Sequence, residues 1–207
     1  MIWEWEGREV RALVFDVDGT LYPQGPLRRA MMLRLARAYW HSPLQGWNTL
    51  LGLRAYRQAQ ERLRLTPSAG VDQLGTGSIR RWMEDEPLDL LRALVYDGLE
   101  EMLAAARSDG LKLGVFSDYP AEKKLRTMGL DKYFDVVVSA QDPEVRRFKP
   151  DALGLKITLR RLGVAKEDAV YVGDRADVDG AAAAAAGMRC VILGDYEELM
   201  RSMCLPK

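Results

Sequence analysis

Residues 12–20 read Ala12-Leu13-Val14-Phe15-Asp16-Val17-Asp18-Gly19-Thr20 and join an apolar run to two carboxylates. A short apolar run bounded by turn residues is typical of a buried strand, and an Asp-Gly pair is common in turns. A turn alone explains Asp18-Gly19, but it does not explain Asp16 directly after the strand. The stretch therefore predicts a buried strand that ends in acidic side chains.

Four later apolar runs have the same character and predict further buried strands. They cover residues 111–116, 136–138, 169–172 and 190–193. Each is short enough for a strand and is bounded by polar residues or glycine. The chain thus offers five strands for one sheet.

Helical patterns separate these runs. The first ends at the turn Asp109-Gly110, the second opens with Pro150 at its first helical position, and the third is an alanine run that stops at Gly187. Strands that alternate with helices predict an α/β, Rossmann-like fold, in which a parallel sheet carries helices on both faces. The apolar faces of the first two helices are Leu99, Met102, Leu103 and Ala106, and Leu155, Leu159 and Leu162.

The segment 22–91 interrupts the alternation, because it contains helical patterns and loops but no convincing strand. One helical face is expected in its first part and a second helix from about residue 47 to 63, with loops at 66–70 and 75–78. We therefore expect a catalytic core formed by residues 1–21 and 92–207, and a small α-helical cap domain inserted at 22–91. The first helical face consists of Leu27, Met31, Leu35 and Ala38.

Several residues of the expected cap are candidates for packing or for substrate contact. The tryptophans Trp40, Trp47 and Trp82 are expected in the core of the cap, with a position facing the substrate as the alternative. Arg28 and Arg29 are candidate substrate contacts, although solvated helix charges are the more common role for such residues. The only histidine of the chain, His41, is expected in a cap loop or on the surface.

The composition excludes several classes of partner. Thirty basic residues balance thirty acidic ones, so net charge gives no reason to expect binding to nucleic acid or to a membrane. The acidic N-terminus lacks the apolar run of a signal peptide, and no stretch approaches the roughly 18 apolar residues of a membrane span. Two cysteines do not form a disulfide framework, so the protein is expected to be cytoplasmic. Cys190 lies in an apolar run and is expected to be inert core.

Polar side chains follow each of the first four predicted strands. Asp16 and Asp18 follow the first, Ser117 the second and Lys149 the third, within a longer loop; the fourth leads into residues 173–179. Ligands of open parallel sheets bind beyond the carboxyl ends of the strands. Carboxylates, a hydroxyl and an ammonium are therefore expected to meet at one edge of the sheet. The last segment reads Gly173-Asp174-Arg175-Ala176-Asp177-Val178-Asp179.

This set of groups suits phosphoryl transfer. A phosphomonoester repels a carboxylate nucleophile, so a metal ion and a cationic side chain must neutralise its charge. Magnesium prefers oxygen ligands, which the carboxylates of Asp16 and Asp174 and the backbone carbonyl of Asp18 can supply. Asp16 is the candidate nucleophile and Asp18 the candidate acid and base. The substrate-binding candidates are Thr20, Ser117 and Lys149.

These residues resemble the four motifs of the haloacid dehalogenase superfamily, in the same order along the chain. Asp16-x-Asp18-Gly19-Thr20 is similar to the first motif, Ser117 to the second, Lys149 to the third, and Gly173-Asp174 with Asp179 to the fourth. The resemblance implies a magnesium-dependent phosphatase that acts through an aspartyl-phosphate on a small phosphorylated metabolite, either a sugar phosphate or a nucleotide. It also implies that a second acid of the fourth motif orients the lysine or a metal-bound water; we favour Asp179 over Asp177.

Alternatives remain open for single residues and for the function. Asp118 is expected to be structural, Ser117-Asp118 resembles a helix cap, and Arg146 and Arg147 compete with Lys149. A haloacid dehalogenase would have no use for Asp18 as an acid. A phosphomutase would use the same aspartyl-phosphate, and a noncatalytic binding module would keep only the fold. The sequence leaves the oligomeric state open.

Overall fold

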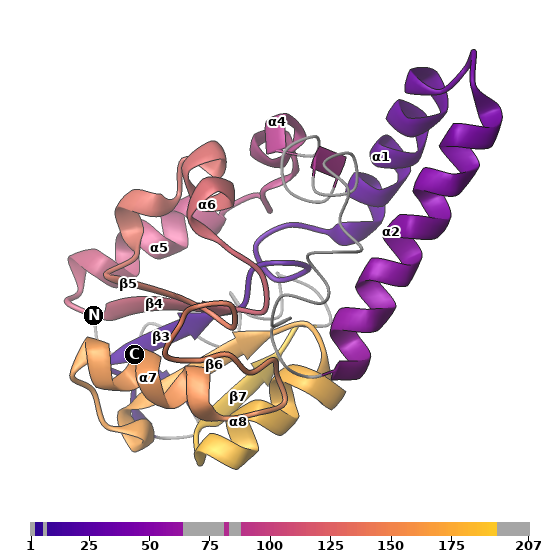
Figure 1. Ribbon diagram of the computed structural model, residues 1–207. Coiled ribbons are helices and arrows are strands. Elements are labelled where there is room, and N and C mark those ends of the chain that lie inside the picture. The colour runs from indigo at the N-terminus through magenta and orange to yellow at the C-terminus, as the bar shows by residue number, and fades with distance from the viewer. Residues whose placement is uncertain (1–2, 6–7, 64–80, 83–87, 194–207) are drawn as a thin grey trace.

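The computed structural model describes residues 3–5, 8–63, 81–82 and 88–193 (Figure 1). Five parallel strands form the central sheet, in the order β5-β4-β3-β6-β7. All five coincide with predicted strands to within one residue at either end, so the prediction of a parallel α/β fold is confirmed. They are β3 (Ala12–Phe15), β4 (Lys112–Ser117), β5 (Val136–Ser139), β6 (Ala169–Gly173) and β7 (Arg189–Ile192).

The strand that carries Asp16 lies at the centre of the sheet. β3 pairs with β4 on one side and with β6 on the other, so that Phe15 lies opposite both Val115 and Val172. Every residue of β3 is buried. A small antiparallel hairpin of β1 (Glu4–Trp5) and β2 (Arg8–Glu9), which the sequence did not predict, precedes the sheet.

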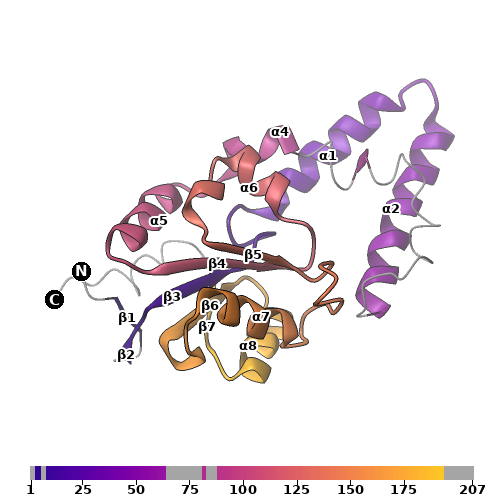
Figure 2. The ribbon, with the colours of Figure 1, turned by 60° about the vertical axis from the view of Figure 1, so that its left-hand side comes forward.

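Helices cover both faces of the sheet (Figure 2). Leu13 and Phe15 pack with α5 (Leu99–Ser108) and α6 (Glu122–Met128), whereas Ala12 and Val14 belong to the core formed with α7 (Leu153–Leu162) and α8 (Ala181–Ala186). This division follows from the alternation of side chains along a strand. Short helical turns, η3 (Asp131–Tyr133), η4 (Lys166–Asp168) and the π-type η5 (Ala176–Gly180), complete the connections.

The start of α7 corrects one prediction. Pro150 lies in the turn before the helix and not at its first position, because α7 begins only at Leu153. The side chain of Asp151 accepts a hydrogen bond from the Leu153 backbone N–H at 2.8 Å. A carboxylate thus satisfies one of the N–H groups that a helix start leaves without an internal partner.

The described part of 22–91 is helical. α1 (Gln24–Ala38) and α2 (Pro43–Leu63) form a hairpin that projects from the sheet in Figures 1 and 2, and α4 (Leu88–Leu91) with η2 (Arg92–Leu94) leads back to the core. α2 begins about four residues earlier than expected. The loops predicted at 66–70 and 75–78 lie outside the described residues. The division into a core and a cap domain remains a prediction.

Of the three tryptophans expected in the core of the cap, one is buried and two are exposed. Trp82 is buried, with 4% of its surface exposed, and its ring centroid lies 6.4 Å from that of Tyr39. Trp40 and Trp47 are 78% and 59% exposed, so their prediction as cap core was wrong. Trp47 lies in the first turns of α2, and Trp40 lies in the turn that joins α1 and α2. His41 is exposed in that turn, as expected.

Candidate active site

Asp16 is fixed by the sheet. It follows the last residue of β3, and its backbone N–H donates a hydrogen bond to the Val172 carbonyl of β6 at 2.9 Å. The hydroxyl of Thr20 donates to Asp16 Oδ2 at 3.3 Å. Both residues are buried. A carboxylate at the end of a central, paired strand has little freedom to move, which suits a group that must meet a reacting atom in a defined direction.

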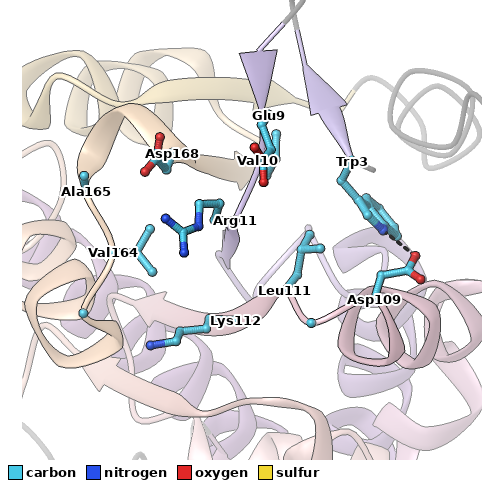
Figure 3. A pocket seen from close by; sticks show the side chains of 12 residues that line it. Trp3, Glu9, Val10, Arg11, Asp109, Leu111, Lys112, Val164, Ala165 and Asp168 are labelled. Atoms are coloured by element: carbon cyan, nitrogen blue, oxygen red, sulfur yellow. Dashed lines mark hydrogen bonds between the residues drawn. The ribbon is translucent and has the colours of Figure 1, made fainter. Parts of the chain in front are cut away.

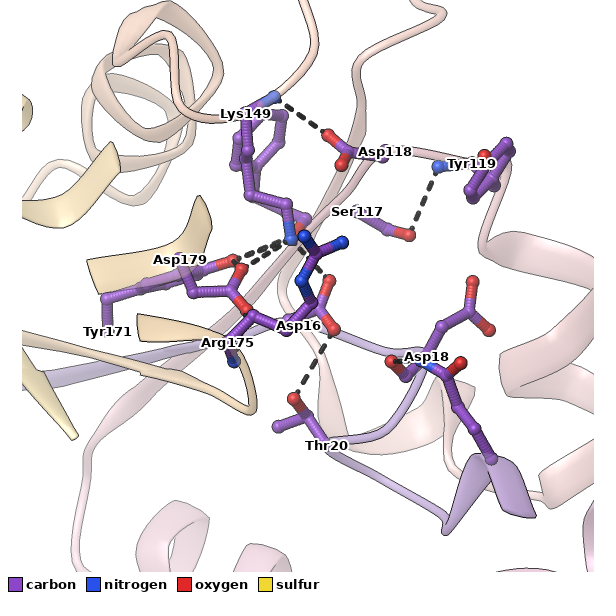
Figure 4. A network of polar contacts seen from close by, with 12 residues as sticks. Asp16, Asp18, Thr20, Ser117, Asp118, Tyr119, Lys149, Tyr171, Arg175 and Asp179 are labelled. Carbon is purple, nitrogen blue, oxygen red and sulfur yellow. Dashed lines mark hydrogen bonds and ion pairs between the residues drawn. The ribbon is translucent and has the colours of Figure 1, made fainter. Parts of the chain in front are cut away.

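Lys149 links two carboxylates that come from opposite ends of the chain (Figure 4). Its Nζ atom lies 2.5 Å from Asp16 Oδ1 and 2.7 Å from Asp179 Oδ1. The hydroxyl of Tyr171 lies 3.1 Å from the same Nζ atom and 3.0 Å from Asp179 Oδ1. All four side chains are buried. The lysine therefore has its three N–H donors directed at Asp16, Asp179 and Tyr171.

Burial and the attraction between opposite charges shift the pKa values of Asp16 and Lys149. Burial raises the pKa of Asp16 to about 7, although the Lys149 ammonium limits the rise. Burial also opposes the charge on Lys149, but the carboxylates around it outweigh that effect and keep the lysine pKa well above its ordinary value. Lys149 is therefore a permanent cation beside Asp16. A bound divalent cation would favour the charged form of Asp16 further.

Three carboxylates are close enough to hold a cation together. Ligand oxygens of Asp16, Asp174 and Asp179 all lie within 4.8 Å of one another. Asp174 follows β6 directly, and Asp179 lies at the end of the turn that this strand leads into. The side chain of Asp179 also accepts a hydrogen bond from the Arg175 N–H at 3.1 Å. Asp177 is exposed and forms an ion pair with Arg175 at 2.9 Å, away from this cluster.

The loop after β3 approaches Asp174 so closely that a side chain is excluded at Gly19. A Cβ atom at this position would lie 2.1 Å from Asp174 Oδ2, and the backbone φ of Gly19 is +107°. Only glycine adopts this conformation readily. The glycine therefore allows the loop that carries Asp16 and Asp18 to lie directly against Asp174.

Asp18 has different partners from Asp16. The Lys124 Nζ atom lies 2.6 Å from each of its carboxylate oxygens, and the hydroxyl of Tyr22 donates to the same group. The side-chain amide of Gln24 donates to the backbone carbonyl of Asp18, the atom expected to bind metal. Burial favours the neutral form of Asp18, but Lys124 outweighs this effect and lowers its pKa. Asp16 and Asp18 thus differ in environment although one residue separates them.

The remaining predicted residues surround this centre. Ser117 ends β4, is buried, and accepts a hydrogen bond from the Tyr119 N–H at 3.3 Å. Asp118 accepts one from the Lys149 backbone N–H at 2.9 Å. It therefore holds the loop of the lysine and does not cap α6, which begins at Glu122. The competitors of Lys149 lie on the surface: Arg146 is exposed, and Arg147 pairs with Asp151.

A cavity of about 580 Å³ opens beside Asp18. Its walls come from the first turns of α1, from Tyr56 of α2, from α4 and from the segment 119–126 that leads into α6. Arg28 lines this cavity, whereas Arg29, exposed on α1, is not among its described lining residues. The volume is within the range of about 300–1,000 Å³ that is usual for small-molecule sites.

Most of this chain matches one family of known proteins. A family model described as haloacid dehalogenase-like hydrolase matches residues 10–187, which include all the residues of the site described above. The chain belongs to this family. A glyceraldehyde 3-phosphate phosphatase of Methanopyrus kandleri is 31% identical over 207 aligned residues, covering 92% of this chain and 87% of the relative. Among haloacid dehalogenase-like hydrolases the chain is thus of the phosphatase type.

Solved structures of the family have the same fold. The haloacid dehalogenase-type phosphatase of Thermococcus onnurineus is 28% identical, with a TM-score of 0.62, and the match covers 90% of this chain and 88% of that one. A β-phosphoglucomutase of Clostridium difficile has a TM-score of 0.63 at 17% identity, covering 93% and 88% of the two chains, and it shows the likeness of fold alone. Among the residues described, no helix has the length and apolar character that a membrane crossing requires.

Sequence reasoning missed four residues that contact the site in this haloacid dehalogenase-like hydrolase. Tyr171 lies inside an apolar run, a pattern that predicts a side chain in the core of a strand and not one in the site. Lys124 lies on a helix whose spacing gives no indication of its direction. Tyr22 and Gln24 follow the first motif closely, and their short distance from Asp18 in the sequence is a signal that could have found them.

Proposed function

We propose that this chain is a magnesium-dependent phosphomonoester hydrolase that acts through an aspartyl-phosphate on Asp16. The observation that carries the proposal is the buried contact of Asp16 with Lys149, next to the carboxylates of Asp174 and Asp179. A carboxylate beside a permanent cation and a second acidic pair has the charge distribution that a dianionic substrate and a divalent metal require.

The donor set fits magnesium. Its ligands would be Asp16 and Asp174 through carboxylate oxygens and Asp18 through its backbone carbonyl, once Gln24 releases that atom. These are hard oxygen donors, which magnesium prefers. When bound, the ion would neutralise part of the phosphoryl charge. Asp179 would act indirectly, because its hydrogen bonds hold Lys149 and the turn at Arg175.

The chain's own residues account for the two chemical steps. In the first, an oxygen of Asp16 forms a bond to phosphorus while the bond to the leaving-group oxygen breaks. Although burial favours its neutral form, Asp18 is ionised in the free protein because Lys124 lowers its pKa. It must therefore take up a proton as the dianionic substrate binds, and it gives this proton to the leaving-group oxygen. In the second, water attacks the same phosphorus, Asp18 takes its proton, and Asp16 is released with inorganic phosphate. Lys149 and the hydroxyls of Ser117 and Thr20 would hold phosphoryl oxygens through both steps.

Hydrolysis of p-nitrophenyl phosphate with and without magnesium tests this proposal. We expect turnover that depends on the metal, and an acyl phosphate on Asp16 that borohydride reduction converts to homoserine, detectable by peptide mass analysis. Absence of turnover on phosphate esters would favour the noncatalytic module. Metal-independent release of halide from a haloacid would favour the dehalogenase. Transfer of the phosphoryl group to a sugar hydroxyl, without release of phosphate, would favour the mutase.

The proposed substrate is a small phosphorylated metabolite, a sugar phosphate or a nucleotide, and the proposed place of action is the cytoplasm. The named activity of the Methanopyrus kandleri relative supports a substrate of this size. We further propose that residues 22–91 form a cap that selects the leaving group. The support for this role is that α1, α2 and α4 line the cavity beside Asp18. Within the cap, Arg28 is the better placed of the two arginine candidates.

A further inference from the structure

The cavity beside Asp18 has two kinds of wall. One is apolar and comes from α1 and α4, which contribute Leu27, Met31, Leu88 and Leu91. The other comes from α6 and the residues just before it. Figures 1 and 2 show α4 beside α6 and the start of α1 nearby, and side chains of all three helices line the same cavity. The apolar part of a ligand can pack against the first wall. The charge of the second wall determines which polar groups of that ligand can bind beside it.

Positive charge dominates the second wall. That wall contributes Lys123, Lys124 and Arg126 but one carboxylate, Glu122. Among all the described residues that line the cavity, four side chains are cationic and two, Asp18 and Glu122, are acidic. A second cavity, of about 480 Å³ at the amino ends of β3 and β4, has the opposite balance (Figure 3). There Arg11 and Lys112 meet three carboxylates. The excess of cations is therefore a property of the cavity next to Asp18. Its four cations are Arg28, Lys123, Lys124 and Arg126.

Lys124 is the cation placed closest to the chemistry. Its side chain is only 15% exposed, and its Nζ atom contacts both oxygens of Asp18 at 2.6 Å. An ammonium has three N–H donors, and Asp18 accounts for two of them. Asp18 is the group proposed to face the leaving-group oxygen. A substituent one or two bonds from that oxygen therefore meets Lys124 before any other cation of the cavity.

We propose that Lys124 is a specificity residue that binds a second anionic group, carried by the leaving-group part of the substrate. The transferred phosphoryl group has its own cation, Lys149, on the other side of Asp16. Among the described residues, Asp18 is the only carboxylate hydrogen-bonded to Lys124, so the ammonium can bridge Asp18 and a second anion. The substrate class is a phosphomonoester with a further carboxylate or phosphate a few bonds away. This inference rests on the proposed phosphatase function.

Matched pairs of esters test the inference on the full chain. The carboxylate arm compares carboxymethyl phosphate with its neutral amide, carbamoylmethyl phosphate. The phosphate arm compares propane-1,3-diyl bisphosphate with 3-hydroxypropyl phosphate. In each arm the readout is the ratio of kcat/KM values, because a ratio cancels any effect on Asp18 that both esters share. The variants are Lys124→Met and Lys124→Gln, with Lys156→Met, an exposed lysine of α7, as the matched control.

The wild type should prefer the anionic ester in at least one arm by about tenfold or more, as expected for a charge-assisted hydrogen bond. Both Lys124 variants should bring that ratio close to one, and Lys156→Met should leave it unchanged. The arm with the larger ratio identifies the anion. Equal kcat/KM values in both arms for the wild type, or a preference that survives in both Lys124 variants, would overturn the inference. Failure to hydrolyse any of the four esters or p-nitrophenyl phosphate would instead overturn the proposed function.

Discussion

The Nζ atom of Lys149 lies 2.5 Å from the Oδ1 atom of Asp16, although 133 positions separate the two residues in the sequence. The lysine keeps its charge because Asp16 and Asp179 surround it. Asp16 thus has a cation on one oxygen, while Thr20 donates to the other. Asp16 and Asp179, the two carboxylates that contact Lys149, are therefore the residues to replace first.

Replacing Asp16 by asparagine keeps the shape of the side chain but removes the negative charge of the attacking carboxylate. We expect turnover to fall by about three orders of magnitude or more, while circular dichroism shows an intact fold. Asp131→Asn, at an exposed carboxylate of η3, is the matched control and should retain activity. Near-normal turnover in a folded Asp16→Asn protein would remove Asp16 as the nucleophile.

Asp179→Asn should weaken the hold on Lys149 without removing the lysine. We expect kcat to fall about tenfold or more with a smaller change in KM, and the free energy of unfolding to fall by about 1–3 kcal/mol, because a charge-assisted hydrogen bond is lost in the interior. The same change at exposed Asp177 should alter neither quantity appreciably. If Asp177→Asn proves the more damaging of the two, the assignment of the second acid of the fourth motif is wrong.

Metal removal should abolish activity reversibly. We expect EDTA to stop turnover, magnesium to restore it, and calcium to inhibit, because the larger and looser coordination shell of calcium permits unproductive carboxylate geometry. Titration calorimetry should show weaker magnesium binding by Asp174→Asn, independently of any assay of turnover. Full activity after rigorous metal removal would contradict the magnesium site and would support the dehalogenase alternative.

Asp18→Asn should separate proton transfer from the attack on phosphorus. General acid catalysis contributes roughly a hundred- to ten-thousandfold, and an aryl leaving group needs less of it than an alkyl one. We expect a much larger loss with an alkyl phosphate than with p-nitrophenyl phosphate. Equal losses with the two esters would argue that Asp18 has another role, such as holding Lys124.

Cys190 should react slowly with thiol reagents. Burial raises the pKa of its thiol to about 11, so at pH 8 far less of it is in the reactive thiolate form than in an ordinary cysteine. In a Cys204→Ser background, alkylation of the folded protein should be about two orders of magnitude slower than in urea, and the rate should keep rising as the pH approaches 11. An alkylation rate that levels off near pH 8.5 would contradict the shift.

The positions of the polar site residues at the ends of the strands could be predicted from the sequence, because apolar runs indicate buried strands and polar residues follow where those strands end. That logic placed Asp16, Ser117 and Asp174 at strand ends, where the structure has them. The same reasoning failed at the start of α7, where no periodic sequence pattern fixes the first residue of the helix. Pro150 suits a first helical turn, yet Asp151 supplies the hydrogen bond at the true start of α7.

The direction in which a side chain points was the second property that the sequence did not predict. Lys124 occupies a position on α6 that a solvated lysine fills equally well, and only the packing of α6 against the sheet turns it toward Asp18. Tyr171 lies within an apolar strand, and the sequence does not show that its hydroxyl points toward Lys149 and Asp179. Trp40 and Trp47 show the converse: an aromatic residue in a helical segment suggests a core, but the α1–α2 hairpin leaves these two exposed.

The position of β3 at the centre of the sheet has a consequence for how the protein is made. Its partners β4 and β6 are synthesised long after it, and Asp179 emerges later still. Contacts across such separations form slowly. A nascent chain released before β6 would therefore carry Asp16 without its neighbour on one side and without Lys149's second carboxylate. Catalytic competence should therefore appear abruptly, only after Asp179 has left the ribosome, and not in stages.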